Sequence, residues 1–321
     1  MSIIGRVAYL DQARGVAMLC IVMLHLTIFN LKGAASEAVG GFCHSFDTRL
    51  LFLLSGMTAA ISMGNKNMKY RECMAIGLKK LRTLFMPFTV WGVIVMPFIY
   101  NHSDVGQLSH LLIQAIDPKT GGYWFLLYLF VFQLVLIGIR FVVSSLSKRI
   151  LNEFWREFFV AFVACWLLFP LYEYLLIFLV GYFVQKYGQR LLFNEVYICV
   201  AFGLFILLYA NAGEWKDYCL VRVIIALSAS SVILAILKRS PIDFCRGIFA
   251  YFGRHSLEIY LIHYCLVAVV KDYAISTDHL YAIPLFFMLG GVAMIICWLC
   301  CKIADALKNI PYVSFVLFGS R

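Results

Sequence analysis

The sequence predicts an all-α integral membrane protein with about ten transmembrane helices. Of its 321 residues, 63% are hydrophobic and 14% are charged, and the mean hydropathy of +0.88 is too high for a soluble domain. Apolar stretches of about 20 residues, the length that crosses a hydrocarbon core of about 30 Å, recur along the chain. Basic and acidic connections also alternate between them. We therefore expect one multi-pass domain over residues 1–321.

The predicted spans follow one another without a soluble domain or linker. Their approximate limits are 15–31, 48–63, 84–101, 123–143, 156–170, 171–187, 195–211, 219–237, 252–270 and 282–304. Spans 48–63 and 156–170 are short, and 156–170 meets the next span at Pro170, so re-entrant or tilted segments are the alternative. The count is uncertain by about two spans. The first apolar run lacks a cleavage site and is expected to stay in the mature protein.

The charges of the connections predict that both termini are cytoplasmic, because Lys and Arg gather in short cytoplasmic loops. The basic connections carry Lys66, Lys69, Arg71, Lys79, Lys80, Arg82, Arg140, Lys148, Arg149, Arg156, Lys186, Arg190, Lys238, Arg239 and Arg246. The alternate connections carry Glu37, Asp47, Asp104, Asp117, Glu173, Glu214, Asp217, Asp272 and Asp278. The net charge of +10 is thus spread over membrane-flanking loops, which predicts anionic membrane lipid or a cytosolic phosphate-bearing molecule as partner, and no nucleic acid.

The cysteines are predicted to be small apolar residues that pack within the membrane spans. The eleven cysteines lie mostly within spans and have no zinc spacing, so we expect no metal site and no disulfide framework.

Asp11, Arg14 and His25 form a polar stripe on the first helix. Arg14 and His25 are eleven positions apart, so they lie within about 20° of each other around a helix and about 16 Å apart along it. Asp11 lies on the same side, three residues before Arg14, a spacing that allows an ion pair. His25 in mid-span either makes an interhelical hydrogen bond or faces a functional pathway.

Span 252–270 offers partners for this stripe. His263 lies about ten residues beyond Gly253, or about 15 Å into the membrane, which is the depth expected for His25. Glu258 follows Arg254 by one turn. These side chains either serve the site or belong to an interfacial ion pair and a packing network.

These residues resemble the acyltransferase-3 family of bacterial membrane acyltransferases. Five segments in register carry the resemblance: Arg14, ten residues and His25, preceded by Tyr9-Leu10-Asp11; FLLSG at 52–56; KKLRTLFMPF at 79–88; YWFLLYL at 123–129; and GRHSLEIYLIHY at 253–264. The family's basic motif usually has Arg where this chain has Lys79, and a lysine lacks the planar fork of arginine. Before the second span the family often has His-Pro, where this chain has Asp47-Thr48-Arg49.

The resemblance implies an O-acyltransferase that moves an acyl group, usually acetyl from cytosolic acetyl-CoA, to a hydroxyl of a cell-surface polysaccharide or lipid-linked glycan; a larger acyl group such as succinyl is the alternative. The location would be the bacterial inner membrane. His25 would act as general base or as a nucleophile forming an acyl-imidazole. Arg14 would hold the donor or stabilise the oxyanion, with Asp11 orienting it, and Lys79 and Arg82 would bind CoA.

Four further residues are site candidates. Glu258 is a catalytic candidate, while Ser55, Trp124 and His263 are candidates for substrate binding. Ser55-Gly56 also suits close helix packing, and Trp124 an interfacial aromatic belt.

A proton-coupled secondary transporter using His25, Arg14 and Glu258 is the competing interpretation. We find no inverted repeat with paired broken helices, which disfavours it. A membrane scaffold would leave Arg14 and His25 unexplained.

Overall fold

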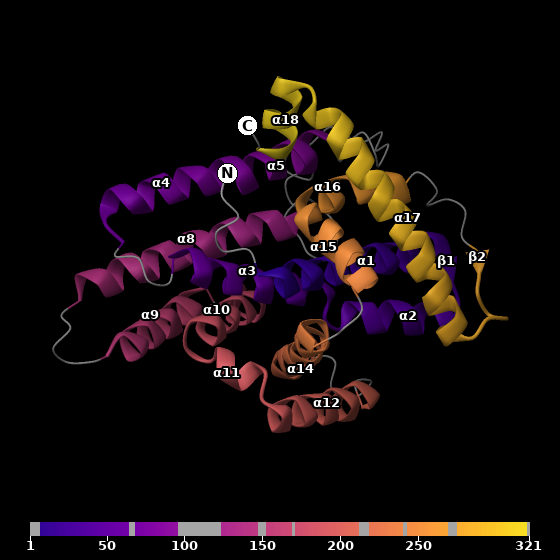
Figure 1. Cartoon of the computed structure of the whole chain (residues 1–321), viewed down its shortest axis with the longest axis horizontal. Helices are drawn as coiled ribbons and strands as arrows, with labels where there is room; N and C mark the ends of the chain where they lie inside the picture. Colours follow the sequence, from indigo (N-terminus) through magenta and orange to yellow (C-terminus); the bar gives the residue numbers. More distant parts are fainter. Residues whose placement is uncertain are drawn as a thin grey trace. The chain divides into compact units, whose positions relative to one another are not determined.

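The chain folds almost entirely into α-helices (Figure 1). The computed structural model describes residues 7–63, 68–95, 123–146, 152–168, 171–211, 218–239, 243–268 and 275–319. Within these ranges the strands are β1 (Leu31–Lys32) and β2 (Ile275–Ser276), which pair in parallel with Leu31 opposite Ile275. The all-α prediction is therefore confirmed, with this short ladder as an addition.

The chain divides into two compact units. The first comprises Met1–Leu54 and Gly188–Leu307, and the second Ser55–Tyr187 and Lys308–Arg321. Helix α3 (Asp47–Met63) contributes to both, because the division falls within it. Each unit is described separately below.

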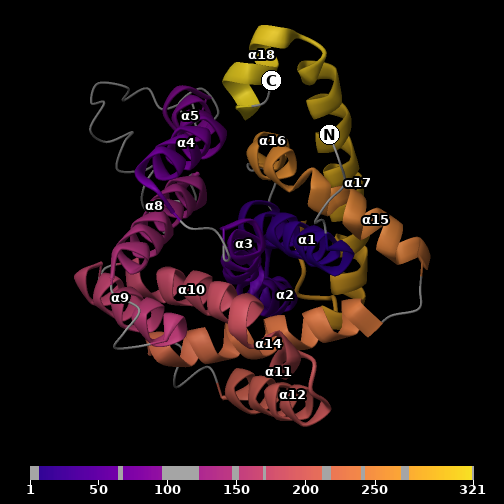
Figure 2. The same ribbon diagram turned by 60° about the vertical axis from the view of Figure 1, so that its left-hand side comes forward.

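Helix α1 (Ala8–Asn30) is the central element of the first unit. It packs against α2 (Ala34–His44), α14 (Cys219–Arg239), α15 (Asp243–Arg254) and α16 (Ser256–Ala268), as Figure 2 shows. Helices α11 (Gln189–Leu192) and α12 (Glu195–Ala210) follow the second unit in sequence, and α12 packs on α14. Because α1 has neighbours on several sides, its buried residues lie on all of its faces.

Two glycines allow α1 and α15 to approach closely. A Cβ atom on Gly15 would overlap the carbonyl of Phe249, and one on Gly253 would overlap the carbonyl of Asp11. Small residues at helix crossings permit such backbone contact in membrane proteins. The contact also fixes the position of α1 along the axis of α15. Because α16 follows α15 directly after His255, the position of α1 beside α16 is fixed as well.

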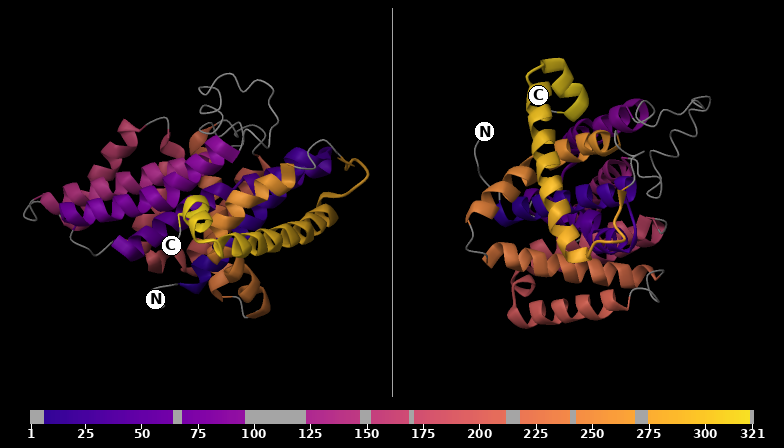
Figure 3. Two further views of the ribbon diagram at one scale, coloured as in Figure 1. Left: turned by 90° about the horizontal axis from the view of Figure 1, so that it is seen from above. Right: turned by 90° about the vertical axis from the view of Figure 1, so that its right-hand side faces the viewer.

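Helix α17 (Ala282–Lys308) is the long C-terminal helix of the first unit (Figure 3). Its cysteines Cys297, Cys300 and Cys301 are fully buried, in agreement with a packing role. Its opposite side exposes large apolar side chains such as Phe287 and Ile295. An exposed apolar helix face of this length is suited to lipid.

Four helices among the described residues are long and apolar enough to cross a membrane: α1, α8 (Trp124–Ser145), α14 and α17. The other predicted spans coincide with shorter helices, and the number of ten spans stays a prediction. Span 252–270 is divided, because α15 ends at Arg254 and α16 begins at Ser256. Parts of the predicted spans and loops, including residues 96–101, Pro170, Lys66, Asp104, Asp117, Lys148, Arg149, Glu214, Asp217 and Asp272, lie outside the described residues.

The second unit contains an irregular helix. It runs from α4 (Tyr70–Lys80) through the π-helical η1 (Leu81–Phe85) and α5 (Met86–Phe88) into the π-helical η2 (Thr89–Val95). Pro87 lies between the two π segments; it has no backbone N–H, and its ring crowds the preceding turn, so a regular hydrogen-bond ladder cannot continue.

The C-terminal helix α18 (Pro311–Phe318) packs against α5 and η2 within the same unit. Two hydrogen bonds join the end of the chain to η1 and η2: Arg82 Nε of η1 donates to the Gly319 carbonyl at 3.0 Å, and Trp91 Nε1 of η2 donates to the Leu317 carbonyl at 3.0 Å. Gly319 has φ of 61°, and a Cβ there would overlap the Arg82 carbonyl. Glycine is therefore the residue that this helix end requires.

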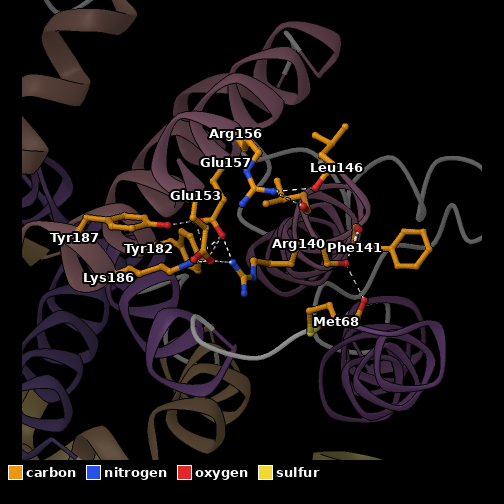
Figure 4. A network of polar contacts seen from close by, with 12 residues as sticks. Met68, Arg140, Phe141, Leu146, Glu153, Arg156, Glu157, Tyr182, Lys186 and Tyr187 are labelled. Atoms are coloured by element: carbon orange, nitrogen blue, oxygen red, sulfur yellow. Dashed lines mark hydrogen bonds and ion pairs between the residues drawn. The ribbon is translucent and has the colours of Figure 1, made fainter. Parts of the chain in front are cut away.

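A polar network joins α8, α9 (Glu153–Leu167) and α10 (Tyr172–Tyr187), as Figure 4 shows. Glu157, whose side chain is 0% exposed, forms an ion pair with Arg140. Its Oε1 also lies 2.8 Å from Lys186 Nζ. Glu153 also accepts from Arg140 Nη1 at 2.8 Å and from Lys186 Nζ at 2.7 Å. Tyr187 donates its hydroxyl to Glu157 at 2.9 Å. Arg140 and Lys186, which the sequence places in cytoplasmic connections, are thus paired with carboxylates within the protein.

Candidate active site

His25 and His263 meet in the first unit. Nδ1 of His25, on α1, lies 2.8 Å from Nε2 of His263, on α16, and the two rings are nearly parallel, 5.0 Å apart at 19°. His263 is 1% exposed, and His25 is half-buried. The similar depth expected for the two histidines is consistent with this contact.

Aromatic rings enclose the His25 imidazole. Phe29 stacks on it at 5.8 Å, and Tyr264 presents its edge at 5.3 Å. His263 is held from its other side, because its Nδ1 lies 2.8 Å from the Ile259 carbonyl oxygen. Both rings therefore have restricted orientations.

Asp11 and Arg14 form the ion pair that their spacing predicts. Arg14 Nη1 lies 3.1 Å from Asp11 Oδ1, with side chains that are 22% and 9% exposed. Asp11 is also at the crossing of α1 and α15, since its carbonyl touches Gly253. Arg14 is thus held at a fixed place on the face of α1 that includes His25.

Glu258 is buried in the first turn of α16. It lies five positions before His263, so the two are about 140° apart around the helix. The structure therefore does not direct Glu258 toward the same side of α16 as His263, and its catalytic role stays a prediction.

Lys79 and Arg82 belong to the second unit. Lys79 is exposed in the last turn of α4, and Arg82 is half-buried in η1. Besides its bond to Gly319, Arg82 carries its guanidinium 5.5 Å from the ring centre of Phe315. The C-terminal helix thereby holds this arginine, a contact that the sequence did not suggest.

Ser55 and Trp124 also belong to the second unit. Ser55 is half-buried on α3, and a Cβ on the adjacent Gly56 would overlap the carbonyl of Phe178. Gly56 therefore permits close helix packing, and the substrate-binding role of Ser55 stays a prediction. Trp124 lies 5.3 Å from Tyr128 and 5.2 Å from Tyr174 between ring centres, in an aromatic cluster at the start of α8.

A groove of about 630 Å³ runs along α1 and α2 in the first unit. Leu24 and Ile28 line it, together with the exposed side chains of Lys32 and Glu37. His25 is not among the residues that line it, although Ile28 lies only about 60° around α1 from His25. The candidate site is therefore defined by the paired histidines. Within the part of the chain that the structure describes, no cluster of three or more His, Cys, Asp or Glu could hold a metal ion.

The fold and the histidine pair define a helical membrane protein with a group able to exchange protons. The chain belongs to the acyltransferase-3 family, since the model of that family, described as an acyltransferase domain, matches residues 7–302. No curated protein and no solved structure gives a significant match. The resemblance seen in the sequence is confirmed, and the protein is a membrane acyltransferase. The match includes every candidate site residue and ends before α18.

Proposed function

We propose that the protein transfers an acetyl group from cytosolic acetyl-CoA to a hydroxyl of a cell-surface polysaccharide or lipid-linked glycan. It would act as a multi-pass protein of the bacterial inner membrane with both termini in the cytoplasm. The observation that carries this proposal is the contact of His25 with His263 inside the region that matches the family.

His25 is the group that removes the hydroxyl proton. As the proton moves to the imidazole, the oxygen lone pair forms a C–O bond to the thioester carbonyl. The C–S bond then breaks, and the leaving thiolate takes the proton from the imidazole. In the nucleophilic variant the imidazole lone pair attacks the thioester carbonyl and the C–S bond breaks to release the thiolate. The hydroxyl oxygen then attacks the acyl-imidazole, the C–N bond breaks, and the hydroxyl proton passes to the thiolate.

Arg14 is suited to stabilise the oxyanion or to hold the donor. Its charge is oriented by the 3.1 Å contact with Asp11. Hydrogen bonds from a fixed cation to developing negative charge are among the stronger contributions to catalysis.

Lys79 and Arg82 are suited to the phosphates of CoA. Arg82 follows Lys79 by about one helical turn. Lys79 is exposed, and Arg82 is hydrogen-bonded to the Gly319 carbonyl at the end of the C-terminal helix. Lysine and arginine both pair with phosphate, and arginine does so with the more defined geometry.

For the acceptor, Trp124 with Tyr128 and Tyr174 offers an aromatic platform, and Ser55 a hydroxyl on α3. Glu258 would support the site from the first turn of α16. The contact between His263 and His25 favours a positioning role over direct substrate binding for His263. The transporter interpretation has no specific observation in its favour, and family membership argues for the transferase.

The test uses the purified full-length protein in detergent together with cells that express it. We expect acetyl-CoA to bind, and Arg14→Ala and Arg82→Ala to weaken binding about tenfold or more, because each removes a charge-assisted hydrogen bond. We expect His25→Ala to abolish acetylation of the surface glycan, measured by NMR, while exposed His279→Ala leaves it intact. Absence of acetyl-CoA binding would refute the donor assignment, and full acetylation in His25→Ala cells would refute the role of His25.

A further inference from the structure

We propose that His263 is a positioning residue that holds His25 in one tautomer, with the proton on Nδ1 and the lone pair on Nε2. Nε2 is then the atom that takes the proton from the acceptor hydroxyl. The inference rests on the proposed function for its chemical meaning, but the tautomer itself can be measured without any reaction.

The first step concerns His263 alone. Its Nδ1 lies 2.8 Å from the Ile259 carbonyl oxygen, and a carbonyl can only accept a hydrogen bond. Nδ1 of His263 therefore carries a proton. The side chain is 1% exposed, and an imidazolium is costly to keep away from water, so the neutral ring is the resting form. In a neutral ring protonated at Nδ1, Nε2 is an acceptor.

The second step determines which nitrogen of His25 donates a hydrogen bond and which one accepts. The 2.8 Å separation between His25 Nδ1 and His263 Nε2 requires one proton between them. Because His263 Nε2 is the acceptor, His25 Nδ1 is the donor. A neutral His25 that carries its proton on Nδ1 has its lone pair on Nε2.

The third step concerns which nitrogen of His25 is available to accept a proton from a substrate. Phe29 and Tyr264 restrict the ring of His25 by a stacked and an edge-on contact. Within the described residues Nε2 of His25 has no hydrogen-bond partner, and the side chain is only half-buried. The backbone carbonyl of Ile259 thus determines, through two imidazoles, which atom of His25 can accept a proton.

The arrangement is the neutral counterpart of a catalytic triad, in which a third group holds the histidine in the correct tautomer. When Nε2 takes the hydroxyl proton, the oxygen lone pair forms the ester bond, and the thiolate released by C–S cleavage later removes the same proton. The imidazolium that exists between these events keeps its hydrogen bond to His263. The acceptor and the donor thioester supply all the atoms and electrons of the step.

The decisive experiment is NMR of the full-length protein with ¹⁵N- and ¹³C-labelled histidine in lipid nanodiscs. Ring shifts separate protonated from unprotonated nitrogens, and comparison with His25→Gln identifies the His25 signals. We expect a protonated Nδ1 and an unprotonated Nε2 in the wild type. His263→Phe keeps a planar aromatic ring but removes the acceptor and should produce mixed tautomers. His263→Gln supplies an oxygen near the position of Nε2 and should retain the wild-type tautomer in part.

A kinetic measurement separates positioning from binding. With membranes that contain the native glycan, thiol release from acetyl-CoA should show a kcat for His263→Phe that is lower by up to about 10⁴-fold, the cost of a wrong tautomer in a triad. KM for acetyl-CoA should stay unchanged, and His263→Gln should recover part of kcat. Melting temperatures of both variants check that the protein is folded.

The outcomes separate the two proposals. An unprotonated Nδ1 on His25 in the wild type, or an unaltered His25 spectrum in folded His263→Phe, would overturn the tautomer assignment whether or not acetyl-CoA binds. If His263→Phe does not fold, the wild-type and His263→Gln spectra decide. Conversely, if the spectra are as predicted but acetyl-CoA does not bind, the proposed donor is wrong and the tautomer assignment of His25 is retained.

Discussion

Replacement of Glu157 by Gln should destabilise the second unit strongly, because it leaves two cations without their buried partner. Glu157 is 0% exposed, and the side chains of Arg140 and Lys186 that it pairs with are only 6% and 7% exposed. Glutamine keeps the shape but has one amide oxygen in place of two carboxylate oxygens, so it loses the charge and can accept either from Tyr187 or from the two cations.

The expected magnitude follows from burial. Removal of one partner of a buried ion pair costs about 3–5 kcal/mol. Glu153, which pairs with the same cations but is 49% exposed, remains in place. We therefore expect the lower end, about 3 kcal/mol, and a fall of at least about 4 °C in Tm.

Thermal unfolding of the purified protein in detergent, followed by circular dichroism, provides the assay. Glu153→Gln is the matched control, because it removes one carboxylate from the same two cations at an exposed position, where ion pairs contribute about 1 kcal/mol or less. A Tm for Glu157→Gln equal to or above that of Glu153→Gln would refute the reasoning that burial decides the cost.

Two further predictions concern the second unit. Burial alone would raise the pKa of Glu153, but hydrogen bonds from its lysine and arginine partners outweigh this and lower it to about 2 from an ordinary 4.5. Because the pKa is lower in the folded state, the stabilisation is complete above about pH 4.5 and is lost as the pH falls toward 2, so the Tm difference between wild type and Glu153→Gln should shrink from pH 7 to pH 3. Gly319→Val should displace the C-terminal helix from the Arg82 carbonyl and weaken acetyl-CoA binding several-fold in a titration, whereas Gly290→Ala, where an added Cβ meets nothing within 4 Å, should not. Unchanged binding in Gly319→Val would separate the C-terminal helix from the donor site.

The long apolar helices could be predicted from the sequence, because a continuous apolar run of membrane length has few other solutions. Predicted spans 123–143 and 219–237 correspond to α8 and α14 within a few residues. The break at His255 could not be found in this way, because no proline marks it and the apolar run resumes directly after it. Short helices such as α2 and α18 were missed, because each is too short to show a clear period.

In the candidate site, too, local contacts could be predicted from the sequence and long-range contacts could not. The ion pair of Asp11 with Arg14 is local, so helical spacing predicted it. The contact of His25 with His263 joins residues 238 positions apart, and spacing along separate helices predicted their depth but not that they face each other. The partners of Arg140 and Lys186 were missed because the charge rule counts basic residues in loops without asking what pairs with them.

The choice of a second imidazole beside His25 also bears on how the chain enters the membrane. A carboxylate at the position of His263 would add about 2.5–3.5 kcal/mol to the insertion of α16. Two neutral rings avoid this added cost at mid-helix, and the hydrogen bond between them forms only after both helices are in place. In the proposed mechanism the histidine pair is charged only while a proton is in transit, so one pair of side chains is suited to both membrane assembly and acid–base chemistry.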